Sequence, residues 1–515
     1  MCMKGVLAKT FSAELEGIAS RLVEVEVDIN VGLSSFTIVG LADKAISEAK
    51  ERVSSALKNC GIKPPTRENR KITVNLAPAD VKKQGSGYDV AIALGYLIAS
   101  GQIASFPSQR CVFLGELALD GSLRSVPGVL SACQMARDSG FEEIYIPLGN
   151  AKEAALVNGV SIFAVEHLSA LIAHLEKRET LSPLVVVDFK PGDQLYETDI
   201  SEIKGQQSAK RALMIAAAGN HNLFLFGPPG TGKTMLARSI LSILPPITRE
   251  EALEATHVYS VAGLLAHQPF ISSRPFRAPH HSASLVSIVG GGQYPKPGEI
   301  SLAHRGVLFL DELPEFHRDV LEALRQPLEH GVVTVSRARG TLLFPAGFML
   351  VAASNPCPCG YYQDLEKECR CSAYEILRYQ KKLSGPLLDR IDMQLWVGRI
   401  TSQDLKKSPD YEESRAIRER VMRARGIQHQ RCLSAQSLAC WNAQLSSKQV
   451  EALVRLDQDA QQLADTMLDK AHITTRGYFK VLKVAQTIAD IEGKSVVDRD
   501  CVAEAFSYRT REASI

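Results

Sequence analysis

The sequence predicts an α/β protein with several domains: an α+β unit, then an open, mainly parallel sheet, then a helical tail. Three observations predict this order. At 515 residues the chain exceeds what one hydrophobic core usually organises. Short apolar runs at residues 222–226, 306–310 and 348–354 alternate with helical stretches, as buried parallel strands do. After residue 400 strand signals are scarce, and helical spacing appears at residues 412–430, 447–470 and 475–491.

The first part of the chain mixes strand and helix signals. Residues 23–27 alternate between Val and Glu, whereas residues 45–59 and 90–100 have helical spacing. The periodicity then fades into a stretch with Pro183 and Pro191, which indicates a linker. The predicted boundaries are 1–180 for the α+β domain, 181–198 for the linker, 199–400 for the sheet domain and 401–515 for the helical domain.

The composition is that of a globular protein, with 45% hydrophobic and 23% charged residues. The formal net charge of +2 neither requires nor excludes a nucleic-acid partner, so any DNA contact has to come from local patches. The N-terminus lacks the pattern of a secretion signal, and no apolar run is long enough to span a bilayer. We therefore expect a cytoplasmic protein without membrane segments.

A phosphate-binding loop is the strongest motif in the chain. The run GPPGTGKT at residues 227–234 follows a predicted strand and opens a predicted helix at residues 235–244. Lys233 is placed to reach the terminal phosphates of ATP, and the Thr234 hydroxyl to bind Mg²⁺. A Gly-rich turn without function would not require the final Lys-Thr. The residues expected around ATP are Gly227, Pro228, Pro229, Gly230, Thr231, Gly232, Lys233, Thr234 and Met235.

Two further strands end in polar groups that complete a hydrolytic site. Asp311 and Glu312 follow the strand at 306–310, where Asp311 would orient the hydrated Mg²⁺ and Glu312 would polarise the attacking water. Asn355 follows the strand at 348–354 and would sense the γ-phosphate. Each could instead be a solvated strand end or a turn residue. A water-activating acid favours hydrolysis over phosphoryl transfer to a small molecule.

Two arginines far from the phosphate loop are candidates for contacts with the γ-phosphate. Arg390 lies in the run LLDRID at residues 387–392 and is predicted to reach the ATP of a neighbouring subunit. Arg476, in the helical tail, is predicted to touch the γ-phosphate from a lid. Taken singly, each would be a surface ion-pair partner. An arginine that acts in a neighbour implies a ring.

Four of the eleven cysteines crowd into one loop directly after Asn355. In a reducing compartment this spacing favours a structural Zn²⁺ site over a disulfide framework. The spacing is C-x-C rather than the usual C-x₂-C, and the alternative is a set of packed free thiols. The predicted ligands are Cys357, Cys359, Cys369 and Cys371.

A string of motifs resembles the magnesium-chelatase-like branch of AAA+ proteins, and more closely the bacterial ComM/YifB family. The resemblance extends from Lys4 to Arg509. It implies an AAA+ ATPase core with a helical lid. The motifs are GQ at 205–206, AKRA at 209–212, RPFRAPHH at 274–281, PGEISLAH at 297–304, DELPEF at 311–316, LRQPLE at 324–329, NPCPCG at 355–360 and SGPLLDRID at 384–392.

The first domain resembles the Lon protease domain, which has a ribosomal-S5-like fold, through residues 36–41, 72–80 and 85–89. A protease of this type needs a Ser nucleophile and a Lys base. Ser86 lies near the expected place but in a different local pattern, and no Lys occurs between Arg124 and Arg137. We therefore predict a non-proteolytic scaffold, which by analogy could help to hold DNA.

The family resemblance implies a homo-hexameric ATPase that translocates on single-stranded and branched DNA without reading sequence, and that promotes branch migration during natural transformation. Basic residues at 270–304 and in a predicted hairpin at 333–344 are compatible with contacts to phosphates. These segments could equally be structural or intersubunit loops. Rival functions are a magnesium-chelatase-type motor, a protein-remodelling ATPase and a Ser/Lys protease. The candidate DNA contacts are Arg274, Arg277, Lys296, Arg337 and Arg339.

Overall fold

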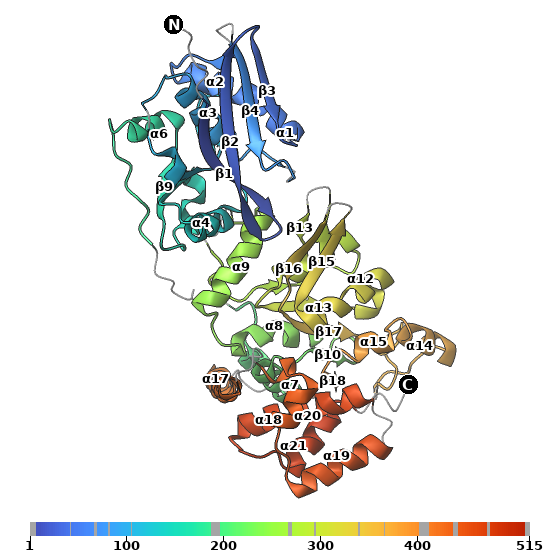
Figure 1. Cartoon of the computed structure of the whole chain (residues 1–515). Coiled ribbons are helices and arrows are strands. Elements are labelled where there is room, and N and C mark those ends of the chain that lie inside the picture. Colours follow the sequence, from blue (N-terminus) through green and yellow to red (C-terminus); the bar gives the residue numbers. More distant parts are fainter. Residues whose placement is uncertain are drawn as a thin grey trace. The chain divides into compact units, whose positions relative to one another are not determined.

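The structure is a computed structural model of the 515-residue chain (Figure 1). It describes residues 7–41, 43–65, 70–80, 83–104, 106–186, 196–265, 270–292, 295–337, 340–364, 366–400, 411–435, 441–470 and 474–509. Half of the predicted linker, residues 187–195, lies outside this set. The chain divides into two compact units. Unit 1 comprises Met1–Lys190, Arg249–Ser272 and Ser336–Phe344, and unit 2 comprises Pro191–Thr248, Ser273–Val335 and Pro345–Ile515.

Unit 1 is built on a mixed seven-stranded sheet in the order β3-β4-β2-β1-β5-β8-β9. The predicted alternation at 23–27 is confirmed, because it lies in β2, where the valines are buried and the glutamates face outward beside Lys9. The strands are β1 (Ala8–Glu16), β2 (Ala19–Val31), β3 (Ser35–Val39), β4 (Arg70–Ala77), β5 (Cys111–Phe113), β8 (Glu143–Pro147) and β9 (Ser161–Val165), with a separate pair β6 (Glu116–Leu117) and β7 (Leu123–Arg124).

Among the helices of unit 1, α3 and α4 pack against β1 and β2 of this sheet. The helix predicted at 90–100 is present as α3 and is buried almost throughout. The helix predicted at 45–59 is interrupted at Glu48, and the Arg52 guanidinium donates to the Ala45 carbonyl beside the break. The helices are α1 (Lys44–Ser47), α2 (Ala49–Asn59), α3 (Asp89–Ala99), α4 (Val129–Asp138), α5 (Ala151–Ala154), α6 (Leu168–Leu175) and α9 (Arg249–Ala262).

Unit 2 contains a parallel five-stranded sheet in the order β11-β14-β17-β10-β18. The three predicted parallel strands are confirmed as β10, β14 and β17, and every residue in them is buried. The predicted hairpin is also present. The hairpin strands are β15 (Val332–Arg337) and β16 (Gly340–Pro345), and their residues from Ser336 to Phe344 belong to unit 1. The other strands are β10 (Leu223–Phe226), β11 (Phe276–Arg277), β12 (Gly290–Gly291), β13 (Lys296–Pro297), β14 (Val307–Leu310), β17 (Met349–Ser354) and β18 (Met393–Trp396).

The helical tail shares one hydrophobic core with the sheet of unit 2. The segment with helical spacing at 447–470 contains two helices, because Leu456 pairs with Val497 and the Asp457 carboxylate accepts from the Ala460 N–H to start the second. The helices of unit 2 are α7 (Gln207–Gly219), α8 (Lys233–Ile243), α10 (Leu285–Val289), α11 (Glu299–Leu302), α12 (Arg318–Ala323), α13 (Arg325–His330), α14 (Ala373–Gln380), α15 (Gly385–Leu388), α17 (Tyr411–Ser434), α18 (Ser447–Leu453), α19 (Gln458–Lys470), α20 (Thr475–Glu492) and α21 (Arg499–Ser507).

A buried ion pair joins the helical tail to the sheet. Lys480 of α20 lies 2.7 Å from the Asp392 carboxylate, at the start of β18, and both side chains are about nine-tenths buried. The charge of Lys480 keeps the pKa of Asp392 low against the opposing effect of burial. Such a pair fixes where the helices attach, because separating it would leave a buried charge uncompensated. None of the described helices is long and apolar enough to cross a membrane.

Candidate nucleotide-binding site

The phosphate loop connects the end of β10 to the start of α8 in unit 2. Gly230 and Gly232 have φ values of +79° and +84°, which glycine adopts without strain, and their Cα atoms face open space. The first N–H groups of α8 have no partner within the helix and carry its positive dipole end. The loop therefore offers backbone donors to a bound phosphate. Met235, in the first turn, is about half exposed beside this surface.

Lys233 extends back across the loop towards the neighbouring strand. Its ammonium group donates to the carbonyls of Gly227 and Pro228, both at 2.8 Å, and to Asn355 Oδ1 at 3.2 Å. Burial lowers the pKa of Lys233 to about 8, partly opposed by the Asp311 charge. The structure thus brings together the predicted phosphate-binding lysine and the predicted sensor Asn355, two residues 122 positions apart.

Asp311 and Thr234 meet on the other side of the loop. The Thr234 hydroxyl donates to Asp311 Oδ2 at 2.8 Å, and the Glu312 N–H donates to Asp311 Oδ1 at 2.9 Å. A hydroxyl and a carboxylate in contact at the mouth of a phosphate loop are the hard oxygen ligands that Mg²⁺ takes directly or through water. These residues fit the Mg²⁺ that accompanies ATP. The ion would bring positive charge to the β- and γ-phosphates.

Glu312 is held at an unusual backbone angle and has a partner that the sequence did not predict. Its φ is +50°, in the left-handed region, and its side chain is 53% exposed. Its carboxylate lies 3.3 Å from Nδ1 of His281, which follows β11. The His281 ring lies 4.1 Å from that of His280. An HH pair in a long insertion carries no signal for this contact, because only the fold places the insertion beside Glu312.

The two predicted γ-phosphate arginines share one partner, a carboxylate outside the phosphate loop. Arg390, just after α15, and Arg476, at the start of α20, both pair with the carboxylate of Glu329 on α13. Among the described residues neither arginine bonds to Lys233 or Asp311. Glu329 belongs to a motif that carried the family resemblance, but the sequence assigned it no role.

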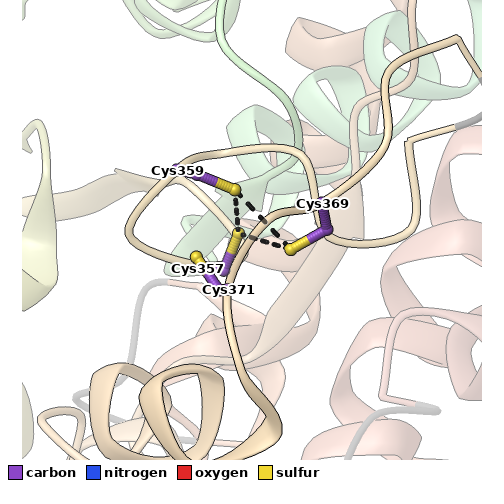
Figure 2. A group of neighbouring side chains, drawn as sticks. All are labelled: Cys357, Cys359, Cys369 and Cys371. Atoms are coloured by element: carbon purple, nitrogen blue, oxygen red, sulfur yellow. Dashed lines mark hydrogen bonds between the residues drawn. The ribbon is translucent and has the colours of Figure 1, made fainter.

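The four predicted zinc ligands come together in the loop between β17 and α14 (Figure 2). Cys357 is buried, the other three are partly exposed, and all four sulfur atoms lie within 4.8 Å of one another. Three Sγ–Sγ distances are 3.4, 3.6 and 3.7 Å. A tetrahedral zinc site with Zn–S bonds of about 2.3 Å has sulfur atoms about 3.8 Å apart. The cluster therefore has the dimensions that zinc requires.

The cysteine loop lies directly against the phosphate loop. Cys357 is two residues from Asn355, and a Cβ added to Gly360 would meet Pro229 Cδ at 2.8 Å. The Asp364 carboxylate ties the loop to Arg399, whose Nη2 lies 2.9 Å away. A change in the shape of this loop would therefore move both Asn355 and the phosphate loop.

The candidate DNA contacts have different surroundings. The Arg274 side chain is 8% exposed, and it donates to the carbonyls of Pro245 and Arg305. Arg277 makes two hydrogen bonds to the Glu299 carboxylate. Lys296 is exposed. Arg339 and the side chain of Arg337 lie outside the described residues. We therefore retain Lys296 for the DNA proposal and leave out Arg274 and Arg277.

A phosphate loop after a buried parallel strand, with a carboxylate pair on a strand two positions away in the sheet, defines the class of P-loop nucleotide-binding proteins. Family comparisons agree. The family described as magnesium chelatase, subunit ChlI, matches residues 199–405, its C-terminal counterpart matches 411–509, and the family described as subunit ChlI of Mg-chelatase matches 25–150.

Two similar proteins cover nearly the whole chain, and a third covers less than a third of it. The competence protein ComM of Haemophilus influenzae is 44% identical over 98% of this chain and 97% of its own. The uncharacterized protein YifB of Escherichia coli is 43% identical over 96% and 95%. The magnesium-chelatase 38 kDa subunit of Rhodobacter capsulatus is 30% identical over 30% of this chain and 49% of its own. The chain therefore belongs to the ComM/YifB family of magnesium-chelatase-like AAA+ proteins.

The lowered pKa of Lys233 predicts how ATP binding depends on pH. Above about pH 8 the free protein has lost the Lys233 proton, and binding a polyphosphate has to restore it. We expect the Kd for Mg-ATP to rise above that pH, by up to about tenfold per unit, and to change little below it. Calorimetry in buffers of different ionisation enthalpy should record proton uptake on binding. A constant Kd through pH 9 without proton uptake would contradict this account of Lys233.

Proposed function

We propose that this protein is a hexameric AAA+ motor that hydrolyses ATP to translocate on DNA and promotes branch migration of recombination intermediates, notably during natural transformation. The ATPase half of the proposal is carried by one observation: Thr234 meets Asp311 while Lys233 meets Asn355 at the same loop. The DNA half is supported by full-length similarity to a competence protein.

In the proposed reaction each residue has one task. Lys233 and the N–H groups of the phosphate loop bind the β- and γ-phosphates, and Thr234 and Asp311 hold hydrated Mg²⁺. Asn355 orients the attacking water, and Glu312 polarises it as a general base. His281 lies against Glu312 and would limit which way that carboxylate turns.

The proposed ring rests on the arginines. Arg390 and Arg476 share the carboxylate of Glu329, so we extend to Arg476 the role that the sequence predicted for Arg390: both would serve the ATP of a neighbour across a subunit interface. An arginine supplied in trans stabilises the charge of the transferring phosphoryl group. Hydrolysis would then require the subunits to assemble, because each site would need an arginine from the adjacent subunit. This dependence would couple the subunits of the ring.

A non-proteolytic first unit is consistent with the surroundings of Ser86. Its hydroxyl donates to the Glu116 carboxylate, and the buried Lys83 ammonium donates to the Pro78 carbonyl. A Ser/Lys protease needs the amine within reach of the hydroxyl. We propose that this Lon-like unit is a scaffold, and a Ser86-dependent cleavage of casein would overturn that proposal.

We also propose that the four cysteines bind one structural Zn²⁺. Cysteine binds zinc as the thiolate. Burial raises the pKa of Cys359 and so opposes the thiolate, but hydrogen bonds from the backbone at Tyr361 and Arg370 lower that pKa below its usual value. The loop has few apolar side chains of its own to fold around, so the metal would supply the cross-link.

The first prediction of this proposal concerns ATP turnover with and without DNA. Single-stranded or branched DNA should raise the steady-state rate. Lys233→Ala should lower it by about 100-fold or more, because one charge at the phosphates is lost. Glu312→Gln should still bind ATP but turn over about 10²- to 10⁴-fold more slowly. A rate that DNA leaves unchanged, with no DNA binding, would favour a chelatase-type or protein-remodelling ATPase.

DNA binding measured at several salt concentrations can locate the DNA contact. Lys296→Glu should weaken DNA binding at every sequence and reduce the slope of log K against log salt by about one. Lys448→Glu, on the exposed start of α18, makes the same charge change elsewhere and is the matched control. Equal losses in both variants would exclude a specific role for Lys296.

The second prediction concerns metal content. Protein purified without chelators should contain about one zinc per chain, and the double substitution of Cys369 and Cys371 by Ser should contain almost none. ATP turnover of that variant should fall about 10- to 100-fold while ATP still binds, because Asn355 and the phosphate loop are displaced. Cys60→Ser, in unit 1, is the control. A metal content near zero in the wild type would refute the zinc site.

A further inference from the structure

Two arginines and one glutamate form a cluster in unit 2 that the proposed function does not explain. We call Glu329, Arg390 and Arg476 the Glu329 cluster. Glu329 Oε2 lies 2.9 Å from Arg390 Nη2, and Glu329 Oε1 pairs with Arg476 Nη2. One carboxylate thus binds both arginines that are proposed to complete a neighbouring ATP site, each through a different oxygen.

The two terminal nitrogens of Arg390 both have partners in this arrangement. Nη1 donates to the Pro386 carbonyl at 2.7 Å, Nη2 pairs with Glu329, and Nε is buried with no partner among the described residues. The side chain is only 15% exposed. An arginine binds a phosphate by donating these same N–H groups. Arg390 therefore has to leave Glu329 before it can serve a nucleotide.

The cluster also joins the sheet part of unit 2 to its helical tail. Glu329 lies on α13 and Arg390 follows α15, both in the ATPase core, whereas Arg476 lies on α20 of the helical lid. When one arginine leaves, the other still neutralises the Glu329 carboxylate. The two arginines can therefore be released one at a time without leaving a partly buried charge unpaired.

We propose that Glu329 is a positioning residue that sequesters Arg390 and Arg476 within the subunit until the triphosphate of a neighbouring subunit displaces it. The inference rests on the proposed function, because it assumes that both arginines act on a neighbour's ATP. The exchange replaces one charge-assisted pair by another with a more highly charged anion. It is therefore reversible and depends on the nucleotide.

The variant that tests this is Glu329→Gln, which keeps the shape of the side chain and removes its charge. The two arginines are then released more easily, so the KM for ATP should fall by about three- to fivefold. A change of this size corresponds to the free energy of one partly exposed ion pair. The gain should vanish when Arg390→Ala is also present. Glu322→Gln, whose carboxylate pairs with Arg325, is the matched control and should leave KM unchanged. A KM that rises or stays constant in Glu329→Gln would overturn the proposal.

A second measurement does not need hydrolysis. Unfolding midpoints of the wild type, the two single variants and the double variant give the coupling between Glu329 and Arg390. Without nucleotide, we expect the effects of the two substitutions on the unfolding midpoint to be non-additive. With Mg²⁺ and a non-hydrolysable ATP analogue at high protein concentration, we expect the two effects to add. Coupling that persists with the analogue, or that is absent without it, would overturn sequestration. If the coupling disappears with the analogue but the protein does not hydrolyse ATP, only the proposed hydrolytic function is overturned.

Discussion

The parallel pairing of β10, β17 and β14 is the constraint on which the nucleotide site depends. Phe226 lies beside Ser354, and Leu310 lies beside Ala352, so the three strands end at one edge of the sheet. Because every residue of these strands is buried, the register cannot slip without exposing apolar side chains. The phosphate loop, the carboxylate pair and Asn355 are the residues that follow these ends. Their meeting is a consequence of the register.

Three segments that lie outside this edge of the sheet contact residues of the site or of the helices beside it. The cysteine loop continues directly from Asn355 and packs on Pro229, so its shape affects both Asn355 and the phosphate loop. His281, which follows β11, contacts Glu312 and so joins the long insertion to the proposed general base. On the lid side, the buried pair of Lys480 with Asp392 fixes the base of α20, and Arg476 at its first turn is held by Glu329. A nucleotide at this edge could therefore influence the insertion and the lid.

The sequence predicted the elements that repeat a local pattern. Buried parallel strands, the phosphate loop and the cysteine cluster were identified because each depends on residues close in the chain. Contacts between distant segments could not be identified in this way, because no local pattern signals them. Examples are the contact of His281 with Glu312 and the pairing of Glu329 with two arginines. For Arg274 the local pattern gave a wrong expectation. A basic residue in a Gly-rich insertion was expected to be exposed, but the fold buries this side chain among backbone carbonyls. The break before α19 was missed because Asp457 was not recognised as a helix cap.

The central claim is that one subunit's phosphate loop is completed by another subunit's arginine. The most direct measurement mixes two variants: Lys233→Ala, which keeps Arg390 but lacks the phosphate-binding lysine, and Arg390→Ala, which keeps the loop but lacks the arginine. Each alone should turn over ATP slowly, and the mixture should recover part of the wild-type rate, because some interfaces then contain both intact groups. If the mixture shows only the average of the two separate rates, the arginine acts within its own subunit or not at all, and the ring account is contradicted.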